Sequence, residues 1–293
     1  MTNVDQSFTW NELWDECAQR LGSADEARLM IEELSGKKGA AWFIAMGQDA
    51  PPSAADAAGD MVKRRQAGEP LQYILGSWGF RTLDLRVDKR VLIPRPETEQ
   101  VVEAALQLIH AAPQPVVADL GTGSGAIALS IAAEHVGALV YATDVSLDAL
   151  EVANENLRTL PQSAQQRVTL KQGSWFDALP SQTRGAFDLI VTNPPYIGEE
   201  EVGTVEDQVA DWEPHGALFS GADGLDDITH ILEDAASWLK PRGSIIIELA
   251  PQQAEIVAAM ARNAGFSHVA IGRDLADRQR FLVAATPRAS AKQ

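Results

Sequence analysis

Residues 116–129 read VVADLGTGSGAIAL, an apolar run that ends near Asp119 and continues into a glycine-rich turn and a helical run. Glycine lets a backbone turn sharply and approach a ligand, and the free N–H groups at a helix N-terminus attract an anion. The stretch therefore predicts a buried strand, a ligand-binding turn and a helix. A turn without a ligand is the weaker interpretation, because a turn does not need three closely spaced glycines.

Apolar runs and helical segments alternate after Glu97, which predicts a parallel sheet with helices on both faces and hence the α/β class. The final run, RFLVAAT at 280–286, follows HVAIG closely enough to predict an antiparallel partner at the edge of the sheet. The predicted strands are VVADL (116–120), ALVYATD (138–144), RVTLKQG (167–173), FDLIVTN (187–193), SIIIELA (244–250), HVAIG (268–272) and RFLVAAT.

The N-terminal region has helical periodicity instead. Two capping-box patterns, Thr9 with Glu12 and Ser23 with Glu26, predict the starts of the first two helices. A third helix is expected over 54–66. These segments predict a small helical domain.

Residues 79–93 change to a period of two, which predicts a hairpin that turns at 88–90 and continues as a second strand over 91–93. The hairpin is expected to link the two parts of the chain. The predicted organisation is a helical domain over 1–76, a β-hairpin linker over 77–93, an α/β domain over 94–286 and a disordered tail over 287–293.

Composition limits the class of protein. The 293-residue chain has 45% hydrophobic and 22% charged residues, which is typical of a soluble globular protein. Its single cysteine, Cys17, forms no disulfide within the chain and favours a reducing compartment. No basic segment opens the chain and no apolar stretch reaches the ~18 residues that span a bilayer, so a cytoplasmic location is expected. A net charge of −17 argues against broad binding to nucleic-acid phosphates.

The glycine turn fits two kinds of ligand. As G-x-G-x-x-A, with Ala126 last, it also satisfies the dinucleotide fingerprint, so an NAD-dependent oxidoreductase or a non-catalytic nucleotide-binding module stays open. Asp144 ends the next predicted strand about 20 residues beyond the turn, where an acid holds ribose hydroxyls. Asp144 or Ser146 could instead cap the following helix. Trp175 could stack on a nucleobase or fill the core, and by itself it favours the core.

Residues 192–198, TNPPYIG, follow the predicted strand FDLIV. The prolines predict a turn, because proline cannot continue a central strand and restrains the residue before it. A turn alone does not explain why an amide, a rigid carbonyl and an aromatic ring gather at the carboxyl end of a strand, where open α/β sheets bind ligands. We therefore expect a binding site here. The histidines are scattered without metal-ligand spacing, so no metal is expected.

Together these motifs make the chain resemble the HemK/PrmC family of S-adenosylmethionine-dependent protein-glutamine methyltransferases. NPPY alone is shared with methyltransferases that act on amino groups of DNA and RNA, so the resemblance depends on the whole set in its order along the chain. The motifs are PLQYILG (70–76), VLIPRPETE (91–99), DLGTGSG (119–125), Asp144, GSWF (173–176), NPPYIG (193–198) and EPHGAL (213–218).

The resemblance implies a class I S-adenosylmethionine-dependent methyltransferase fold, which is Rossmann-like. Its seven-stranded sheet is mostly parallel with an antiparallel inserted strand, and a small N-terminal helical domain recognises the substrate. It also implies S-adenosylmethionine as cofactor and S-adenosylhomocysteine as product. The implied substrate is the glutamine of the GGQ motif in peptide chain release factors, without direct contact with nucleic acid or membrane.

The same resemblance implies roles for individual residues. The turn residues Gly121, Thr122, Gly123, Ser124 and Gly125 would cradle the methionine part of the cofactor, Asp144 would hold its ribose and Trp175 would lie by its adenine. The substrate amide would be bound by Asn193, Pro194, Pro195 and Tyr196, of which Asn193, Pro194 and Tyr196 would be catalytic and Asn193 would also adjoin the cofactor.

The segment before the first predicted strand of the sheet and the identity of the substrate allow more than one interpretation. Residues 92–99 are expected to close over the cofactor end of the site, but the roles of Arg95, Glu97 and Glu248 are undecided. A ribosomal-protein glutamine is an alternative substrate. So is an exocyclic amino group of a nucleic-acid base, which presents the same planar –NH₂, although the acidic balance and the small helical domain argue against it.

Overall fold

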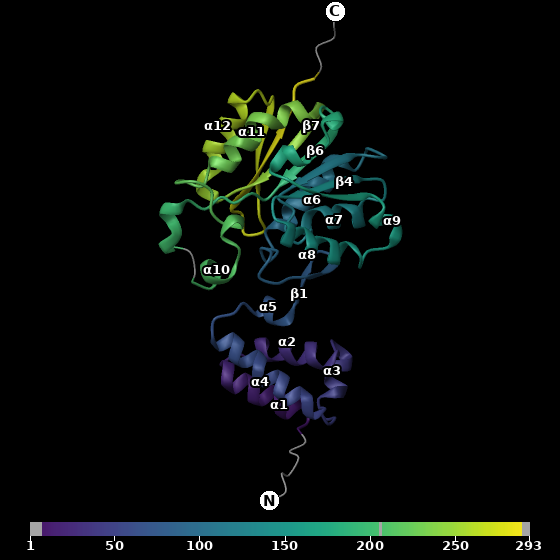
Figure 1. The fold of residues 1–293 in the computed structure, drawn as a ribbon, viewed down its shortest axis with the longest axis vertical. Helices are drawn as coiled ribbons and strands as arrows, with labels where there is room; N and C mark the ends of the chain where they lie inside the picture. Colours follow the sequence, from purple (N-terminus) through teal and green to yellow (C-terminus); the bar gives the residue numbers. More distant parts are fainter. Residues whose placement is uncertain (1–7, 205–206, 289–293) are drawn as a thin grey trace, which may run out of the picture. The chain divides into compact units, whose positions relative to one another are not determined.

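The computed structural model describes residues 8–204 and 207–288, and the chain divides into two compact units, Met1–Ser77 and Trp78–Gln293 (Figure 1). The tail predicted over 287–293 lies outside the described residues from 289 onward.

The N-terminal unit is helical, and the buried faces of its helices form one apolar core. The helices predicted from the two capping patterns and from residues 54–66 are confirmed as α1, α2 and α4. The short α3 and α5, of 6 and 5 residues, were not predicted because neither completes two helical turns. The helices are α1 (Trp10–Leu21), α2 (Ala24–Ser35), α3 (Ala40–Ala45), α4 (Pro52–Gln66) and α5 (Leu71–Leu75).

The two capping patterns differ in the structure. At α1 the Thr9 hydroxyl accepts the Glu12 N–H at 3.2 Å and the Glu12 carboxylate accepts the Thr9 N–H at 2.8 Å. At α2 the Ser23 hydroxyl accepts the Glu26 N–H at 3.2 Å, but the Glu26 carboxylate accepts from Arg65 at 2.8 and 2.9 Å. The second capping box therefore forms only the hydrogen bond to Ser23, because the Glu26 carboxylate pairs with Arg65 of α4 instead.

A hairpin follows the helices. Strands β1 (Ser77–Phe80) and β2 (Leu83–Arg86) form a two-stranded sheet. The connection includes Arg81 in the left-handed region, with φ of 51°.

The predicted position of this hairpin is wrong, because its turn does not lie at 88–90 and residues 91–93 are not a strand. The Ile93 N–H donates to the Glu213 carboxylate at 3.3 Å, and Pro94 has no N–H to donate. The Ile93 N–H is therefore not available for strand pairing.

A seven-stranded sheet forms the centre of the second unit, in the order β5-β4-β3-β6-β7-β9-β8. Neighbouring strands from β5 to β7 pair in parallel, as predicted, and all the predicted strands are present. They are β3 (Val116–Leu120), β4 (Leu139–Asp144), β5 (Val168–Gln172), β6 (Phe187–Thr192), β7 (Leu239–Glu248), β8 (His268–Arg273) and β9 (Gln279–Ala285).

The last strand is antiparallel to both of its neighbours, but its predicted place at the edge is wrong. β9 lies between β7 and β8, and β8 forms the edge. The reason is the greater apolar content of β9, which buries Phe281, Leu282 and Ala284, whereas no residue of β8 is buried.

Helices cover both faces of the sheet. One apolar core joins α6 and α7 to the sheet, and a second joins α11 and α12 to its other face (Figure 1). The helices of this unit are α6 (Thr98–Ile109), α7 (Ala126–Glu134), α8 (Leu147–Leu157), α9 (Gln162–Gln165), α10 (Asp207–Trp212), α11 (Asp226–Trp238) and α12 (Ala254–Asn263). Short 3-10 helices lie at Trp175–Ala178, Ser181–Thr183, Glu199–Thr204, His215–Ala217 and Pro251–Gln253.

The register of the parallel strands brings the motif residues to one edge of the sheet. Leu120 of β3 is paired with Thr143 of β4 and with Thr192 of β6, and Thr192 is paired with Ile247 of β7. The residues that come next along these strands are therefore level with one another: Asp144, Asn193 and Glu248.

Candidate active site

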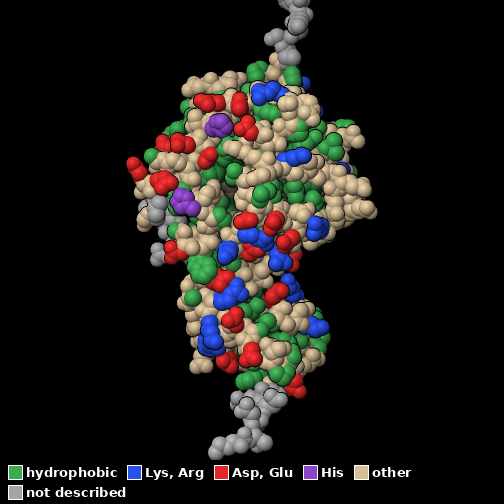
Figure 2. Space-filling model, in the orientation of Figure 1, with side chains coloured by type: hydrophobic (Ala, Val, Ile, Leu, Met, Phe, Trp, Pro, Cys, Tyr) green, Lys and Arg blue, Asp and Glu red, His purple; other side chains and the backbone are tan. Residues whose placement is uncertain are grey.

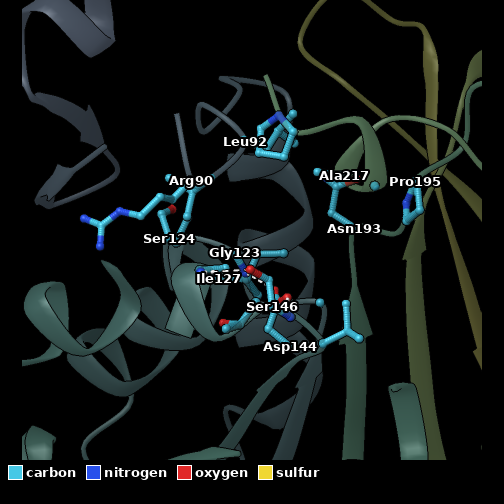
Figure 3. Close-up of a pocket in the computed structure, with 18 of the residues that line it drawn as sticks. Arg90, Leu92, Gly123, Ser124, Ile127, Asp144, Ser146, Asn193, Pro195 and Ala217 are labelled. Atoms are coloured by element: carbon cyan, nitrogen blue, oxygen red, sulfur yellow. Dashed lines mark hydrogen bonds between the residues drawn. The ribbon is translucent and has the colours of Figure 1, made fainter. Parts of the chain in front are cut away.

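A pocket of about 460 Å³ opens at the carboxyl ends of these strands. Figure 3 shows Gly123, Asp144 and Ser146 on one side of it and Asn193 and Pro195 on the other. The pocket brings together most of the predicted site residues, namely Gly121, Thr122, Gly123, Ser124, Asp144, Trp175, Asn193 and Pro195. It does not include Gly125, Pro194 or Tyr196 in its lining.

Asp144 joins the glycine turn to the next helix. Its carboxylate accepts the Gly123 N–H and the Ser146 N–H, each at 2.9 Å. The cap of α8 is Ser146, whose hydroxyl accepts the Ala149 N–H at 3.2 Å. Burial raises the pKa of Asp144. This carboxylate therefore lies in the pocket lining without being the helix cap.

Asp119 holds the glycine turn through hydrogen bonds, a role that was not predicted from the sequence. It is fully buried, and one carboxylate oxygen accepts from the Thr122 hydroxyl at 2.6 Å and from the Ala128 N–H at 3.1 Å. Its other oxygen has no partner among the described residues. Burial raises the pKa of Asp119 to about 7. The sequence pattern that could have indicated this role is an acid at the end of a strand, directly before a glycine turn.

Gly125 is required by packing and not by the pocket. It precedes α7 with φ of 86°, and a Cβ there would lie 2.8 Å from Leu129 Cδ1. Any side chain would press on the first turn of α7.

From the sequence, Trp175 could either stack on a nucleobase or fill the core. In the structure the neighbouring Phe176 fills the core. Phe176 is buried in the core, whereas Trp175 is half-buried, lines the pocket and has φ of 42°. The Trp175 ring contacts Gly121, where a Cβ would be 3.3 Å from the ring atom Cζ3. The indole N–H donates to Asp227 at 3.1 Å. The Trp175 ring is therefore held next to the glycine turn.

The NPPY turn presents two oxygens with free acceptor capacity. Neither the Asn193 side-chain oxygen nor the Pro194 carbonyl oxygen accepts a hydrogen bond from a described residue. Asn193 lines the pocket, and the Pro194 side chain is buried beside it. Tyr196 packs against the core formed with α11 and α12, and burial raises the pKa of its phenol.

Gln253 binds the backbone of the NPPY turn through hydrogen bonds, which was not predicted from the sequence. Its side-chain N–H groups donate to the Tyr196 carbonyl at 2.9 Å and to the Asp223 carbonyl at 3.3 Å, and its oxygen accepts the Ala250 N–H at 3.2 Å. Gly224 packs so closely that a Cβ would overlap the Tyr196 carbonyl oxygen. The backbone after the two prolines is therefore fixed.

The segment before α6 forms another wall. Leu92, Pro94, Arg95 and Thr98 line the pocket. The Arg95 guanidinium pairs at 2.6 Å with Glu213, the first residue of the EPHGAL motif. Burial raises the pKa of Glu213, and Arg95 opposes that rise. Sequence reasoning missed this pair, although both motifs were recognised.

Comparisons with known proteins bear on this site. Residues 12–76 match the family model of the PrmC N-terminal domain, and residues 100–211 match that of the methyltransferase small domain. The release factor glutamine methyltransferase of Bordetella pertussis is 42% identical over 257 residues, which cover 87% of this chain and 92% of the relative. That of Xylella fastidiosa is 38% identical over 271 residues, which cover 92% and 95%. This chain belongs to the release factor glutamine methyltransferase family.

The methyltransferase also resembles solved structures. The hMettl16 catalytic domain in complex with MAT2A 3′UTR hairpin 1 aligns with a TM-score of 0.57 at 15% identity, over 91% of this chain and 92% of that chain. A methyltransferase from Pyrococcus furiosus aligns with a TM-score of 0.50 at 16% identity, over 78% and 99%. At these identities the likeness shows the fold alone, and it confirms the predicted class I methyltransferase fold.

Family membership also decides between the sequence interpretations. It favours a methyltransferase over an NAD-dependent oxidoreductase, whereas the roles of individual site residues stay predictions. Within the described residues, no helix of the methyltransferase is long and apolar enough to cross a membrane.

Proposed function

We propose that this methyltransferase transfers a methyl group from S-adenosylmethionine to the side-chain amide nitrogen of the GGQ glutamine in peptide chain release factors. The names of its relatives support the substrate, since they are release factor glutamine methyltransferases. The observation that carries the chemistry is the pair of unoccupied acceptors in the NPPY turn, Asn193 Oδ1 in the pocket lining and the adjacent Pro194 carbonyl. A primary carboxamide has two N–H donors to match them.

The residues of the glycine turn fit the cofactor. A Cβ at Gly123 would meet nothing within 4 Å, so this part of the turn faces open space. Asp144 offers carboxylate oxygens for ribose hydroxyls, and the half-buried Trp175 ring offers a flat apolar face for a base. Bound there, S-adenosylmethionine would supply an electrophilic methyl group on a sulfonium.

The chain's own contribution is orientation of a poor nucleophile. An amide nitrogen shares its lone pair with its carbonyl, so both N–H bonds must be held for the nitrogen to face the methyl group. Asn193 Oδ1 can accept one N–H and the Pro194 carbonyl the other. The proline rings restrain the backbone on both sides of that carbonyl. Orientation of this kind contributes up to ~7–11 kcal/mol in well-aligned systems.

Tyr196 and Gln253 support the same orientation. The Tyr196 ring can lie against the flat amide and limit its rotation, while Gln253 fixes the Tyr196 carbonyl at 2.9 Å. Hydrogen-bond acceptors that are fixed before the reaction need no reorganisation as charge develops on the amide nitrogen.

Charge supports a protein substrate over nucleic acid. The net charge is −17, and on the face seen in Figure 2 the basic side chains are interspersed with acidic ones. Continuous phosphate binding needs clustered Lys and Arg. The buried free thiol of Cys17 supports a reducing, cytoplasmic location.

Mass spectrometry of methylated products tests the proposal. The full chain and S-adenosylmethionine are incubated separately with a release factor, with ribosomal proteins and with DNA or RNA. The expected result is one added methyl group on the GGQ glutamine and none on the nucleic acids. Methylation of a ribosomal-protein glutamine or of a base amino group, with the release factor unmodified, would overturn it. A release factor with its GGQ glutamine replaced is the matched control.

A further inference from the structure

Glu248 is a buried acid beside the NPPY turn to which the proposed mechanism gives no role. It ends β7, and the pairing of Thr192 with Ile247 places it level with Asn193 on the neighbouring strand. It is 1% exposed, and its Oε2 has no hydrogen-bond partner among the described residues. A buried carboxyl oxygen without a partner is costly, so it requires an explanation.

Two further unpaired polar atoms belong to residues near Glu248. The Thr98 hydroxyl and the Arg280 Nε are both buried without a partner in the part of the chain that the structure describes. Thr98 lies close enough to lower the pKa of Glu248, although neither Thr98 Oγ1 nor Glu248 Oε2 completes a well-formed hydrogen bond. Phe281, which follows Arg280, pairs with Glu248 in the sheet.

Thr98 connects this buried group to the pocket. It begins α6, is 4% exposed and lines the pocket. Glu248 itself is not part of the lining. A hydroxyl both donates and accepts hydrogen bonds, so Thr98 can pass a proton between the pocket and the carboxyl.

The charges around Glu248 are largely compensated by other partners. The Tyr196 phenol is uncharged at neutral pH, and burial raises its pKa further above the ordinary value. Burial is the main cause that raises the pKa of Glu248 to about 7, with Arg280 and Arg95 opposing the rise and Glu97 adding to it. The surrounding pairs are Arg95 with Glu213 at 2.6 Å, Glu97 with Arg278 at 2.8 Å and Arg280 with Asp274 at 3.5 Å.

Methylation of an amide releases a proton that needs an acceptor. The amide nitrogen donates its lone pair to the methyl carbon, and the electron pair of the broken S–C bond stays on sulfur. The nitrogen is then positively charged and must lose one proton to restore a neutral amide. Asn193 and Pro194 offer amide carbonyl oxygens, which accept hydrogen bonds but do not titrate near neutral pH.

We propose that Glu248 takes up this proton, with the Thr98 hydroxyl as the relay between the pocket and the buried carboxyl. This inference rests on the proposed function, because the proton comes from the methylated amide. After methyl transfer, one N–H leaves its acceptor in the NPPY turn and gives its proton to the Thr98 hydroxyl, which donates its own proton to the Glu248 carboxylate. Glu248 returns the proton to solvent after the product leaves.

Activity as a function of pH tests the relay with three variants. In the parent protein we expect single-turnover methylation to rise about tenfold per pH unit and to level off near pH 7. Glu248→Gln should lose this inflection and about 10²-fold of the rate at its plateau. Thr98→Val should lower the rate and lose the inflection as Glu248→Gln does, and Thr98→Ser should restore both. Glu255→Gln, an exposed acid on α12, is the matched control.

A measurement without turnover separates this role from a structural one. Carbon NMR of the glutamate-labelled protein should show one carboxyl that titrates near pH 7 and disappears in Glu248→Gln. If Glu248→Gln does not fold, Thr98→Val with Thr98→Ser rescue still decides. An inflection that survives in Glu248→Gln, or full activity in Thr98→Val, would overturn the inference. A parent protein that does not methylate the release factor would instead overturn the proposed function.

Discussion

The substitution Asn193→Ala tests the role of the NPPY turn in orienting the substrate. Its side chain accepts no hydrogen bond from a described residue, so its removal should change the stability of the fold very little. Loss of one preorganised polar contact to the reacting group costs about 2–4 kcal/mol of transition-state stabilisation. That cost corresponds to a rate about 30- to 1000-fold lower, because each 1.4 kcal/mol is about tenfold.

Single-turnover transfer of a labelled methyl group to the release factor measures this loss, and isothermal titration measures cofactor affinity. We expect the rate to fall in this range while the cofactor dissociation constant changes by less than about tenfold, because Asn193 is one of many pocket residues. Asn263→Ala, the same change at an exposed site on α12, should match the parent protein. Turnover of Asn193→Ala within about threefold of the parent would refute the reasoning.

Three further changes address the supporting residues. Asp144→Ala should weaken cofactor binding about 10- to 150-fold, by loss of charged hydrogen bonds of about 1.5–3 kcal/mol, and unchanged affinity in isothermal titration would contradict this role. Gln253→Ala should lower the urea-unfolding free energy by about 1–3 kcal/mol and reduce kcat more than it changes KM, because the Tyr196 carbonyl loses its donor. Burial raises the pKa of Asp119 from 3.8 to about 7, so the native state holds its proton more tightly than the unfolded state. This contribution to the free energy of unfolding is fully present below about pH 4 and falls by about 3–4 kcal/mol as the pH rises to about 7. Urea unfolding should show that most of this pH dependence is lost in Asp119→Asn.

Local sequence patterns predicted the strands of the central sheet and the two turns at the pocket, but not the turn of the hairpin. Each strand of the central sheet contains an apolar run, and the alternation of these runs with helical segments predicted them. The glycine turn and the NPPY turn were likewise identified from local chemistry, and the structure places both at one pocket. The α/β class followed from alternation alone.

Features that depend on distant contacts could not be predicted in this way. The order of β8 and β9 depends on which strand gains more from burial on both sides, which is a property of the assembled sheet. The Ile93 N–H, which was expected in a strand, instead donates a hydrogen bond to Glu213, 120 residues further along the chain. The hydrogen bond from Gln253 to the Tyr196 carbonyl joins residues that are 57 apart in the chain. A single glutamine after a strand gives no local signal of such a contact.

The contacts of the substrate amide test the central geometric claim most directly. A crystal structure of this methyltransferase with S-adenosylhomocysteine and a release factor would show them. We predict that the glutamine amide nitrogen lies at about 2.7–3.2 Å from both Asn193 Oδ1 and the Pro194 carbonyl oxygen, on the side that faces the cofactor sulfur. A glutamine amide bound elsewhere, with these two oxygens exposed to solvent, would contradict it.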